Sequence, residues 1–267
     1  MRHGRNGVAK RHELLLDTLR TQGALPLSEL AERFSCSVAT IRRDLAALEK
    51  ETGVRRFRGA ASYDGNSIKE VSFTQKASVN GVEKGAIARL VAESLQDGMT
   101  IGLNGGTTTT EVARQLVAYR RQVTVVTNAI NIAHVLADGG INVVVIGGAV
   151  LTTNYETTGP MAMDALRGLH IDVMVLGANG VDVRFGITAS KELEAAVGRA
   201  FVDRSDRVMV VADHTKLQCN AVFRMIEWSS VHQLATDRHS YEIIAQWGVG
   251  ADTSVETDEA ILFNLHN

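Results

Sequence analysis

The chain is poor in cysteine and has no histidine cluster, which argues against two common kinds of site. Only Cys36 and Cys219 occur among its 267 residues, and neither belongs to a CxxC motif or lies near a histidine pair. We predict small buried residues or stray thiols here rather than zinc ligands or a disulfide. The eight histidines are scattered without ligand spacing, so we expect no metal site and no cofactor.

Long apolar runs and nucleotide-binding motifs are also missing. No apolar stretch approaches the roughly 20 residues of a membrane span, and no apolar signal region follows the basic N-terminus. Neither GxGxxG after a strand nor GxxxxGKS/T is present, which argues against a dinucleotide or P-loop site. The 45% hydrophobic content and 24 glycines are typical of a globular α/β protein, and we expect two domains in the cytoplasm.

Charge is distributed unevenly along the chain. Residues 1–62 contain 12 Lys/Arg and 7 Asp/Glu, a balance of +5, whereas the remainder contains 16 basic and 23 acidic residues, a balance of −7. The net charge of −2 therefore hides a basic end on an acidic body. This asymmetry is typical of a chain that presents one end to a polyanion such as DNA.

The stretch after Ser35-Cys36 predicts a short helix with one apolar side. Four large residues recur at three- and four-residue steps: Val38, Ile41, Leu45 and Leu48. The other side then presents small, hydroxyl-bearing and basic residues: Ser37, Ala39, Thr40, Arg42 and Arg43. Small residues let a helix approach the DNA major groove closely, and arginine can bind guanine or phosphate. Taken alone, the stretch could equally be a solvated helix face that carries two arginines.

The flanking sequence favours DNA binding. Helices are predicted over 11–22 and 29–34, with Ser28 capping the second, and a tight turn joins this second helix to the arginine-bearing one. That spacing is typical of a helix-turn-helix. Alternating basic and apolar residues then predict a β-hairpin, a wing, with three residues that would lie against phosphates: Arg55, Arg56 and Arg58.

The rest of the chain alternates between helices and short Val/Ile-rich strands. This pattern predicts a mostly parallel sheet with both faces covered by helices. We expect residues 1–61 to form the DNA-binding domain, 62–81 a polar linker in which Val71 and Phe73 dock on one domain, and 82–267 an effector-sensing α/β domain.

Polar residues follow the predicted strands, where ligands bind in sheets of this type. The strand over 99–103 is followed by Asn104-Gly-Gly-Thr-Thr-Thr-Thr110 and a helix. The glycines expose backbone amides, the threonines add hydroxyls, and the helix N-terminus favours an anion such as phosphate. Other strands end in Thr127-Asn128, Gly147-Gly148, Gly177–Gly180 and Asp213–Lys216. Each could be only a turn or a surface pair, but their common position at one edge favours a site.

Both parts of the chain resemble one family. The block from Ala31 to Leu45, followed by Leu48-Glu49 and Arg56-Phe-Arg-Gly-Ala-Ala61, resembles the N-terminal domain of DeoR-family bacterial transcriptional regulators, although that family often ends the wing in Gly-Gly-Ala. Landmarks of the later part, among them Asn104–Thr108, Gly177–Val181 and Ala212–Lys216, resemble the DeoR sensor domain. That domain is similar to ribose-5-phosphate isomerase and to the CoA-transferase-like sheet.

The resemblance implies a DNA-binding transcriptional regulator, in most of this family a repressor, acting on genes of sugar or related carbohydrate metabolism. It implies operator DNA and a phosphorylated sugar or related effector as partners, a homodimer or homotetramer, and no membrane. The implied effector-binding residues are Lys84, Asn104, Gly105, Gly106, Thr107, Thr108, Thr127, Asn128, Asn179, Glu194 and Lys216. Asn104 and Asn179 stand where many relatives carry Asp, which leaves the identity of the ligand open.

The rival interpretation is a sugar-phosphate isomerase with an added N-terminal domain. Moving a proton between C1 and C2 of an aldose phosphate needs a carboxylate base with further acids or a lysine. The turn that supplies two Asp in the isomerase corresponds to Leu176–Asn179 here, and neither Leu176 nor Asn179 can take a proton. Glu194 alone does not rebuild the site, so we expect no catalytic residues and no enzyme. A pure protein-interaction module has nothing in its favour over the DNA-binding interpretation.

Overall fold

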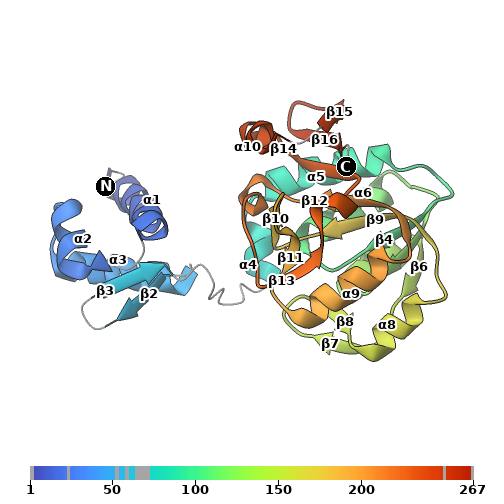
Figure 1. Cartoon of the computed structure of the whole chain (residues 1–267), viewed down its shortest axis with the longest axis horizontal. Helices are drawn as coiled ribbons and strands as arrows, with labels where there is room; N and C mark the ends of the chain where they lie inside the picture. Colours follow the sequence, from blue (N-terminus) through green and yellow to red (C-terminus); the bar gives the residue numbers. More distant parts are fainter. Residues whose placement is uncertain are drawn as a thin grey trace. The chain divides into compact units, whose positions relative to one another are not determined.

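The computed structural model describes residues 3–22, 25–51, 54–57, 60–63, 73–248 and 251–265 (Figure 1). The chain forms two compact units, Met1–Val71 and Ser72–Asn267, and each is described by itself below. Within those described ranges, no helix is both long and apolar enough to cross a membrane.

Unit 1 consists of three helices and a small antiparallel sheet with the strand order β1-β3-β2. Its elements are α1 (His3–Gln22), β1 (Leu25–Pro26), α2 (Leu27–Arg33), α3 (Val38–Glu51), β2 (Val54–Phe57) and β3 (Ala60–Tyr63). Strands β2 and β3 pair from Val54 opposite Tyr63 to Phe57 opposite Ala60. The predicted helix-turn-helix with a β-hairpin wing is therefore confirmed.

Two local predictions in unit 1 are wrong. Ile41 and Leu45 are fully buried in the core that α3 shares with α1 and α2, as expected, but Val38 is 36% exposed. Val38 is the first residue of α3, where the helix end extends past the packed core. Ser28 lies inside α2 instead of capping it, because the helix already begins after Pro26, whose φ of −63° and extended ψ suit the N-cap position.

Unit 2 is built around an eight-stranded sheet in the order β15-β16-β14-β12-β9-β4-β5-β6. All neighbours from β14 to β6 are parallel, and only the pairs β14–β16 and β16–β15 at one edge are antiparallel. The strands are β4 (Thr100–Leu103), β5 (Thr124–Thr127), β6 (Asn142–Val145), β9 (Ile171–Gly177), β12 (Ser205–Val211), β14 (Gln233–Asp237), β15 (Ala251–Glu256) and β16 (Ala260–Leu265). The predicted mostly parallel sheet is thus confirmed.

Helices cover both faces of this sheet (Figure 1). Residues of β9 alternate between the two resulting cores: Val173 and Val175 pack with α5, α6 and α7, whereas Met174 and Leu176 pack with α8, α9 and α10. The helices are α5 (Gly81–Ser94), α6 (Thr107–Ala118), α7 (Ile130–Asp138), α8 (Pro160–Leu166), α9 (Glu192–Val202) and α10 (Tyr241–Trp247). The described part of the unit also contains three short 3-10 helices, η1 (His214–Lys216), η2 (Trp228–Ser230) and η3 (Arg238–Ser240), of which η1 follows β12 and η3 follows β14.

Five short strands form two smaller sheets that the alternation of helices and strands does not predict. One pairs β7 (Ala149–Leu151) with β8 (Glu156–Thr158), and the other has the order β10 (Gly180–Asp182), β11 (Gly186–Ala189), β13 (Phe223–Ile226). Strands of three or four residues carry too little sequence to show a period of two. The C-terminal hairpin of β15 and β16 was likewise not predicted.

The predicted linker over 62–81 is partly structured, which corrects the sequence analysis. Strand β3 continues to Tyr63, a further helix α4 covers Phe73–Ser78, and α5 already begins at Gly81. The ring of Phe73 packs edge-on against Tyr155 with 5.5 Å between centroids. This aromatic contact and the hydrogen bond from Lys84 to the Lys76 carbonyl hold α4 on unit 2. Val71, the other predicted docking residue, lies outside the described residues.

Candidate nucleic-acid interface and effector site

The predicted recognition residues lie at the start of α3. The Ser37 hydroxyl accepts the Thr40 amide at 3.1 Å and lies 2.9 Å from Oγ1 of Thr40, so it caps the helix. Ala39, Arg42 and Arg43 are exposed, while Thr40 is half-buried. The hydroxyls of Ser37 and Thr40 therefore stabilise the start of α3. The guanidinium groups of Arg42 and Arg43 make no ion pair with the described residues.

The next residue, Asp44, is buried and connects α3 to α1. Arg11 donates to its carboxylate over 2.7 and 3.2 Å, and Nε2 of His12 lies 3.0 Å from Oδ1. Burial raises the pKa of Asp44, but the hydrogen bonds from Arg11 and His12 outweigh it and hold the pKa below its usual value. Because Asp44 faces inward, the preceding arginines stay on the outer side of the helix. The sequence analysis did not single out this residue.

The wing places two of its three arginines in a strand. Arg55 and Arg56 belong to β2, where they pair with Ser62 and Ala61 of β3. Arg58 lies outside the described residues. Phosphate contact by these three residues therefore stays a prediction.

The loop between β4 and α6 is anchored by Asn104. Its Nδ2 donates to the carbonyl of Gly177 at 3.0 Å, and its Oδ1 accepts the Gly177 amide at 2.8 Å. This bridge joins the carboxyl ends of β4 and β9. It requires a donor and an acceptor on one side chain, which asparagine has and an aspartate does not. The side chain of Asn104 therefore has a structural role.

Helix α6 begins with backbone amides that no side chain caps. Gly106 at the N-cap position is extended, with φ 164° and ψ 163°. The amides of Thr107, Thr108 and Thr109 have no acceptor among the described residues. The hydroxyls of Thr109 and Thr110 donate to the Gly106 carbonyl, whereas those of Thr107 and Thr108 bond to no described residue. Free amides at the positive end of a helix are suited to an anion.

Thr127 and Asn128 mainly position neighbouring backbone. The Thr127 hydroxyl donates to the carbonyl of Leu103 at 2.7 Å and accepts the amide of Ala129 at 3.1 Å. Asn128 donates through Nδ2 to Thr157 at 3.0 Å, but its buried Oδ1 has no partner among the described residues. A buried acceptor without a partner is costly, so this oxygen is the group of the pair that is open to a ligand or water.

A buried carboxyl group that no sequence pattern points to lies at this edge. Glu156 of β8 is only 3% exposed, and its Oε1 accepts the Gly105 amide at 2.6 Å. Nδ2 of Asn154 bonds to both Glu156 and Glu194. Burial, and then repulsion from Glu194, raise the pKa of Glu156 to about 8. The raised pKa favours the protonated form of Glu156 at neutral pH. The structure thus connects the predicted Gly105 and Glu194 through two residues, Glu156 and Asn154, that the sequence did not point to.

Leu176 and Asn179, which the sequence comparison with the isomerase singles out, both have structural roles. Leu176 is fully buried in the core beneath α9. Asn179 accepts the Ser190 amide through Oδ1 at 3.1 Å, and its own amide donates to Thr188 at 2.9 Å. Asn179 therefore shapes the turn between β9 and β10.

Lys84 and Lys216 lie beside a shared carboxylate, Asp213. The buried ammonium of Lys84 donates to the carbonyls of Lys76, at 2.6 Å, and Val79, at the end of α4. Burial lowers the pKa of Lys84. The negative charge of Asp213 opposes this decrease, whereas the positive charge of Lys216 adds to it. Burial also raises the pKa of Asp213, but the hydrogen bond from Thr215 and the charge of Lys216 outweigh it, so its pKa is lowered.

Known proteins resemble the chain in both units. The DeoR-like helix-turn-helix domain matches residues 11–66, and the DeoR C terminal sensor domain matches residues 79–238. A ribose 5-phosphate isomerase A from Neisseria gonorrhoeae is 14% identical, with a TM-score of 0.39, over 69% of this chain and 75% of that chain. A similarity of this size says nothing about activity.

Relatives of similar length are transcriptional repressors. The transcriptional repressor AccR of Agrobacterium fabrum is 34% identical over 90% of this chain and 93% of its own. The glycerol-3-phosphate regulon repressor of Escherichia coli (strain K12) is 31% identical over 85% of this chain and 90% of its own. Both units and nearly the whole length agree, and the chain belongs to the DeoR family of transcriptional regulators.

Proposed function

We propose that this protein is a repressor whose binding to operator DNA is modulated by a phosphorylated sugar. The observation that carries the proposal is the uncapped start of α6, where three threonine amides and two threonine hydroxyls have no partner among the described residues. A phosphate group would satisfy these donors and interact favourably with the helix dipole. Lys216, in the 3-10 helix η1 that follows β12, would add positive charge.

The N-terminal unit supplies the DNA contacts in this proposal. Arg42 and Arg43 face outward at the start of α3, where a recognition helix contacts base edges. Arg55, Arg56 and Arg58 of the wing would hold the flanking phosphates. A homodimer or homotetramer would present two or more such units to a repeated operator in the cytoplasm. The repressor names of the relatives support this assignment.

Lys84 is the candidate for coupling between ligand and DNA. Its ammonium donates to the carbonyls of Lys76 and Val79 at the C-terminal end of α4. Along the chain, α4 is the first described helix after the DNA-binding unit. A phosphate that attracts this ammonium competes with the carbonyls of Lys76 and Val79. Ligand binding would then change the conformation at the end of α4, so the protein would have one arrangement with Lys84 on the carbonyls and another with Lys84 on the phosphate. The ligand would change operator affinity because it binds these two arrangements with different affinity.

An isomerase remains the second candidate because of one observation. Glu156 and Glu194 form a carboxyl pair bridged by Asn154, so the site holds two carboxyl groups rather than the one that the sequence suggested. Against catalysis, Glu156 is buried with one oxygen on the Gly105 amide, and Leu176 and Asn179 supply no further acid. Regulation without turnover is the better-supported function.

The test uses the full chain with ribose 5-phosphate, and with ribose as the unphosphorylated control. Calorimetry should show that ribose 5-phosphate binds and that ribose does not. Thr107→Val should weaken the binding of ribose 5-phosphate about tenfold or more, which corresponds to the loss of one hydrogen bond to a charged group. Thr124→Val, at the opposite end of the neighbouring strand β5, is the matched control and should bind normally. The same ligand should change a gel shift with operator DNA, and no ketose phosphate should form.

Two results would contradict the proposal. Turnover of an aldose phosphate above background would make the protein an enzyme. Absence of binding across a set of aldose and polyol phosphates would make the start of α6 a structural turn.

A further inference from the structure

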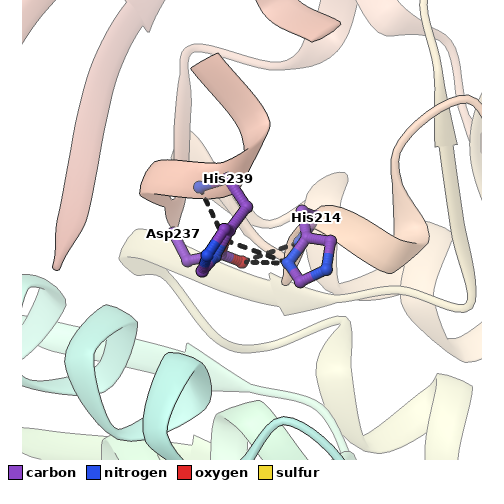
Figure 2. A group of neighbouring side chains, drawn as sticks. All are labelled: His214, Asp237 and His239. Atoms are coloured by element: carbon purple, nitrogen blue, oxygen red, sulfur yellow. Dashed lines mark hydrogen bonds and ion pairs between the residues drawn. The ribbon is translucent and has the colours of Figure 1, made fainter. Parts of the chain in front are cut away.

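Two histidines that are distant in the sequence meet on one buried carboxylate (Figure 2). His214 opens η1 after β12, and His239 lies in η3 after β14. Nδ1 of His214 lies 3.0 Å from Oδ1 of Asp237, and Nδ1 of His239 lies 3.1 Å from the same oxygen. The two rings have their centroids 5.1 Å apart. One possible ligand atom from each residue lies within 4.8 Å of the other two.

The carboxylate is held in place by backbone amides. Asp237 ends β14 and is 1% exposed. The His214 amide donates to Oδ2 at 2.7 Å, and the His239 amide donates to Oδ1 at 3.0 Å. Hydrogen bonds of this kind orient ligating carboxylates in metal sites. The position of Asp237 therefore does not depend on the imidazole contacts.

We propose that His214, Asp237 and His239 bind a divalent transition-metal ion of the Zn²⁺ type. Two imidazole nitrogens and one carboxylate oxygen select such an ion over Mg²⁺ or Ca²⁺, which take oxygen ligands. Zinc with bonds of about 2.0–2.1 Å places tetrahedral ligand atoms about 3.3 Å apart. The distances of 3.0 and 3.1 Å from the two imidazole nitrogens to Oδ1 of Asp237 are close to this spacing. This proposal is independent of the proposed effector site.

The site has room for a further ligand. The side chains of His214 and His239 are 30% and 69% exposed, whereas that of Asp237 is 1% exposed. Three protein ligands leave at least one coordination position, which water or an anionic group can fill. Lys216, a predicted effector-binding residue, lies in the same 3-10 helix as His214, so a metal here would be next to it in the sequence.

The competing interpretation needs no metal. Both imidazoles can donate from Nδ1 to Asp237, and the trio would then only fix the ends of β12 and β14. A second group, His170 with Asp172 and Asp206, offers a comparison: it has one imidazole, none of its side chains is buried, and its contacts are 3.3 and 3.7 Å. We expect no comparable affinity there.

The experiment titrates the untagged full chain with Zn²⁺ in competition with a chromophoric chelator, without sugar phosphate or DNA. The wild type should bind one Zn²⁺ per chain. His239→Ala, a change at an exposed side chain that should leave the fold intact, should weaken binding at least about tenfold. His214→Ala should do the same, and both should lose the absorption of a tetrahedral Co²⁺ complex.

Three control variants separate this site from other zinc ligands of the chain. His134→Ala on α7 removes an exposed histidine outside both trios, His170→Ala removes the second trio, and Cys219→Ser removes an exposed thiol. All three should bind like the wild type. Equal affinity of the wild type and His239→Ala would overturn the proposal, as would loss of binding in any control. Failure of sugar-phosphate binding would leave the result unaffected.

Discussion

The amide of Gly105 donates to the buried carboxyl group of Glu156 over 2.6 Å. The contact fixes the start of the β4–α6 loop to β8, a strand from another part of the chain. It also leaves no space at the glycine, because a Cβ atom built there would lie 2.2 Å from Cγ of Glu156. Close approach, rather than an unusual backbone angle, is therefore the reason for glycine at this position.

Gly105→Ala should destabilise unit 2 and disturb the candidate effector site. Forcing an extra carbon against Glu156 should cost about 1–3 kcal/mol of unfolding free energy. Both tryptophans, Trp228 and Trp247, lie in unit 2 with ring centroids 5.3 Å apart, so fluorescence during urea unfolding reports on this unit alone. Gly147→Ala is the control, since its Cβ would meet nothing within 4 Å. Equal stability of the two variants would show that the loop adapts freely.

Glu156 should make the stability of unit 2 fall with rising pH. Its pKa is about 8 in the folded chain and 4.5 for the free group, so the folded state holds the extra proton between these values. The stabilisation is full below about pH 4.5 and is lost as the pH rises through about 8, by at most about 1.4 kcal/mol per pH unit. Glu156→Gln should flatten this dependence in urea unfolding from about pH 5 to about pH 9. An unchanged slope would mean that the carboxyl group is ionised in the folded state.

The sequence predicted the architecture because the patterns behind it are long. Helical steps of three and four residues run through 11–48, and buried strands of four to seven residues alternate with helices after residue 82. Each pattern repeats often enough to be recognised. The strands β7, β8 and β10 have three residues each and depend on their neighbours for pairing, so no local signal marks them.

The site was predicted less completely, because its chemistry depends on distant contacts. Loop residues such as Thr107 could be inferred from the strand–glycine–helix pattern alone. Glu156 is separated by 51 residues from the glycine that it contacts, and its raised pKa comes from burial that only the fold creates. The meeting of His214 and His239 on Asp237 likewise requires β12 and β14 to be neighbours, which spacing along the chain does not show.

Arg43→Ala should weaken specific operator binding while the fold remains intact. Arg43 is exposed near the start of α3, and loss of a bidentate base contact should cost about 1–3 kcal/mol per DNA-binding unit. Arg43→Lys keeps the charge but not the bidentate geometry, so it should lose specificity and keep non-specific binding. Gel shifts with operator and scrambled DNA measure both, and circular dichroism checks the fold. Unchanged operator affinity of the alanine variant would remove Arg43 from base recognition.

Replacing the three wing arginines should lower affinity without changing sequence preference. Contacts to phosphate position a protein on DNA but do not read its sequence, so Arg55, Arg56 and Arg58 should contribute equally to operator and non-specific DNA. With all three changed to alanine, the slope of log affinity against log salt should flatten by about 0.9 for each phosphate that the variant no longer neutralises. Fluorescence anisotropy with labelled DNA over a salt series measures this slope. If the slope of the triple variant equals that of the wild type, the wing does not lie on the DNA backbone.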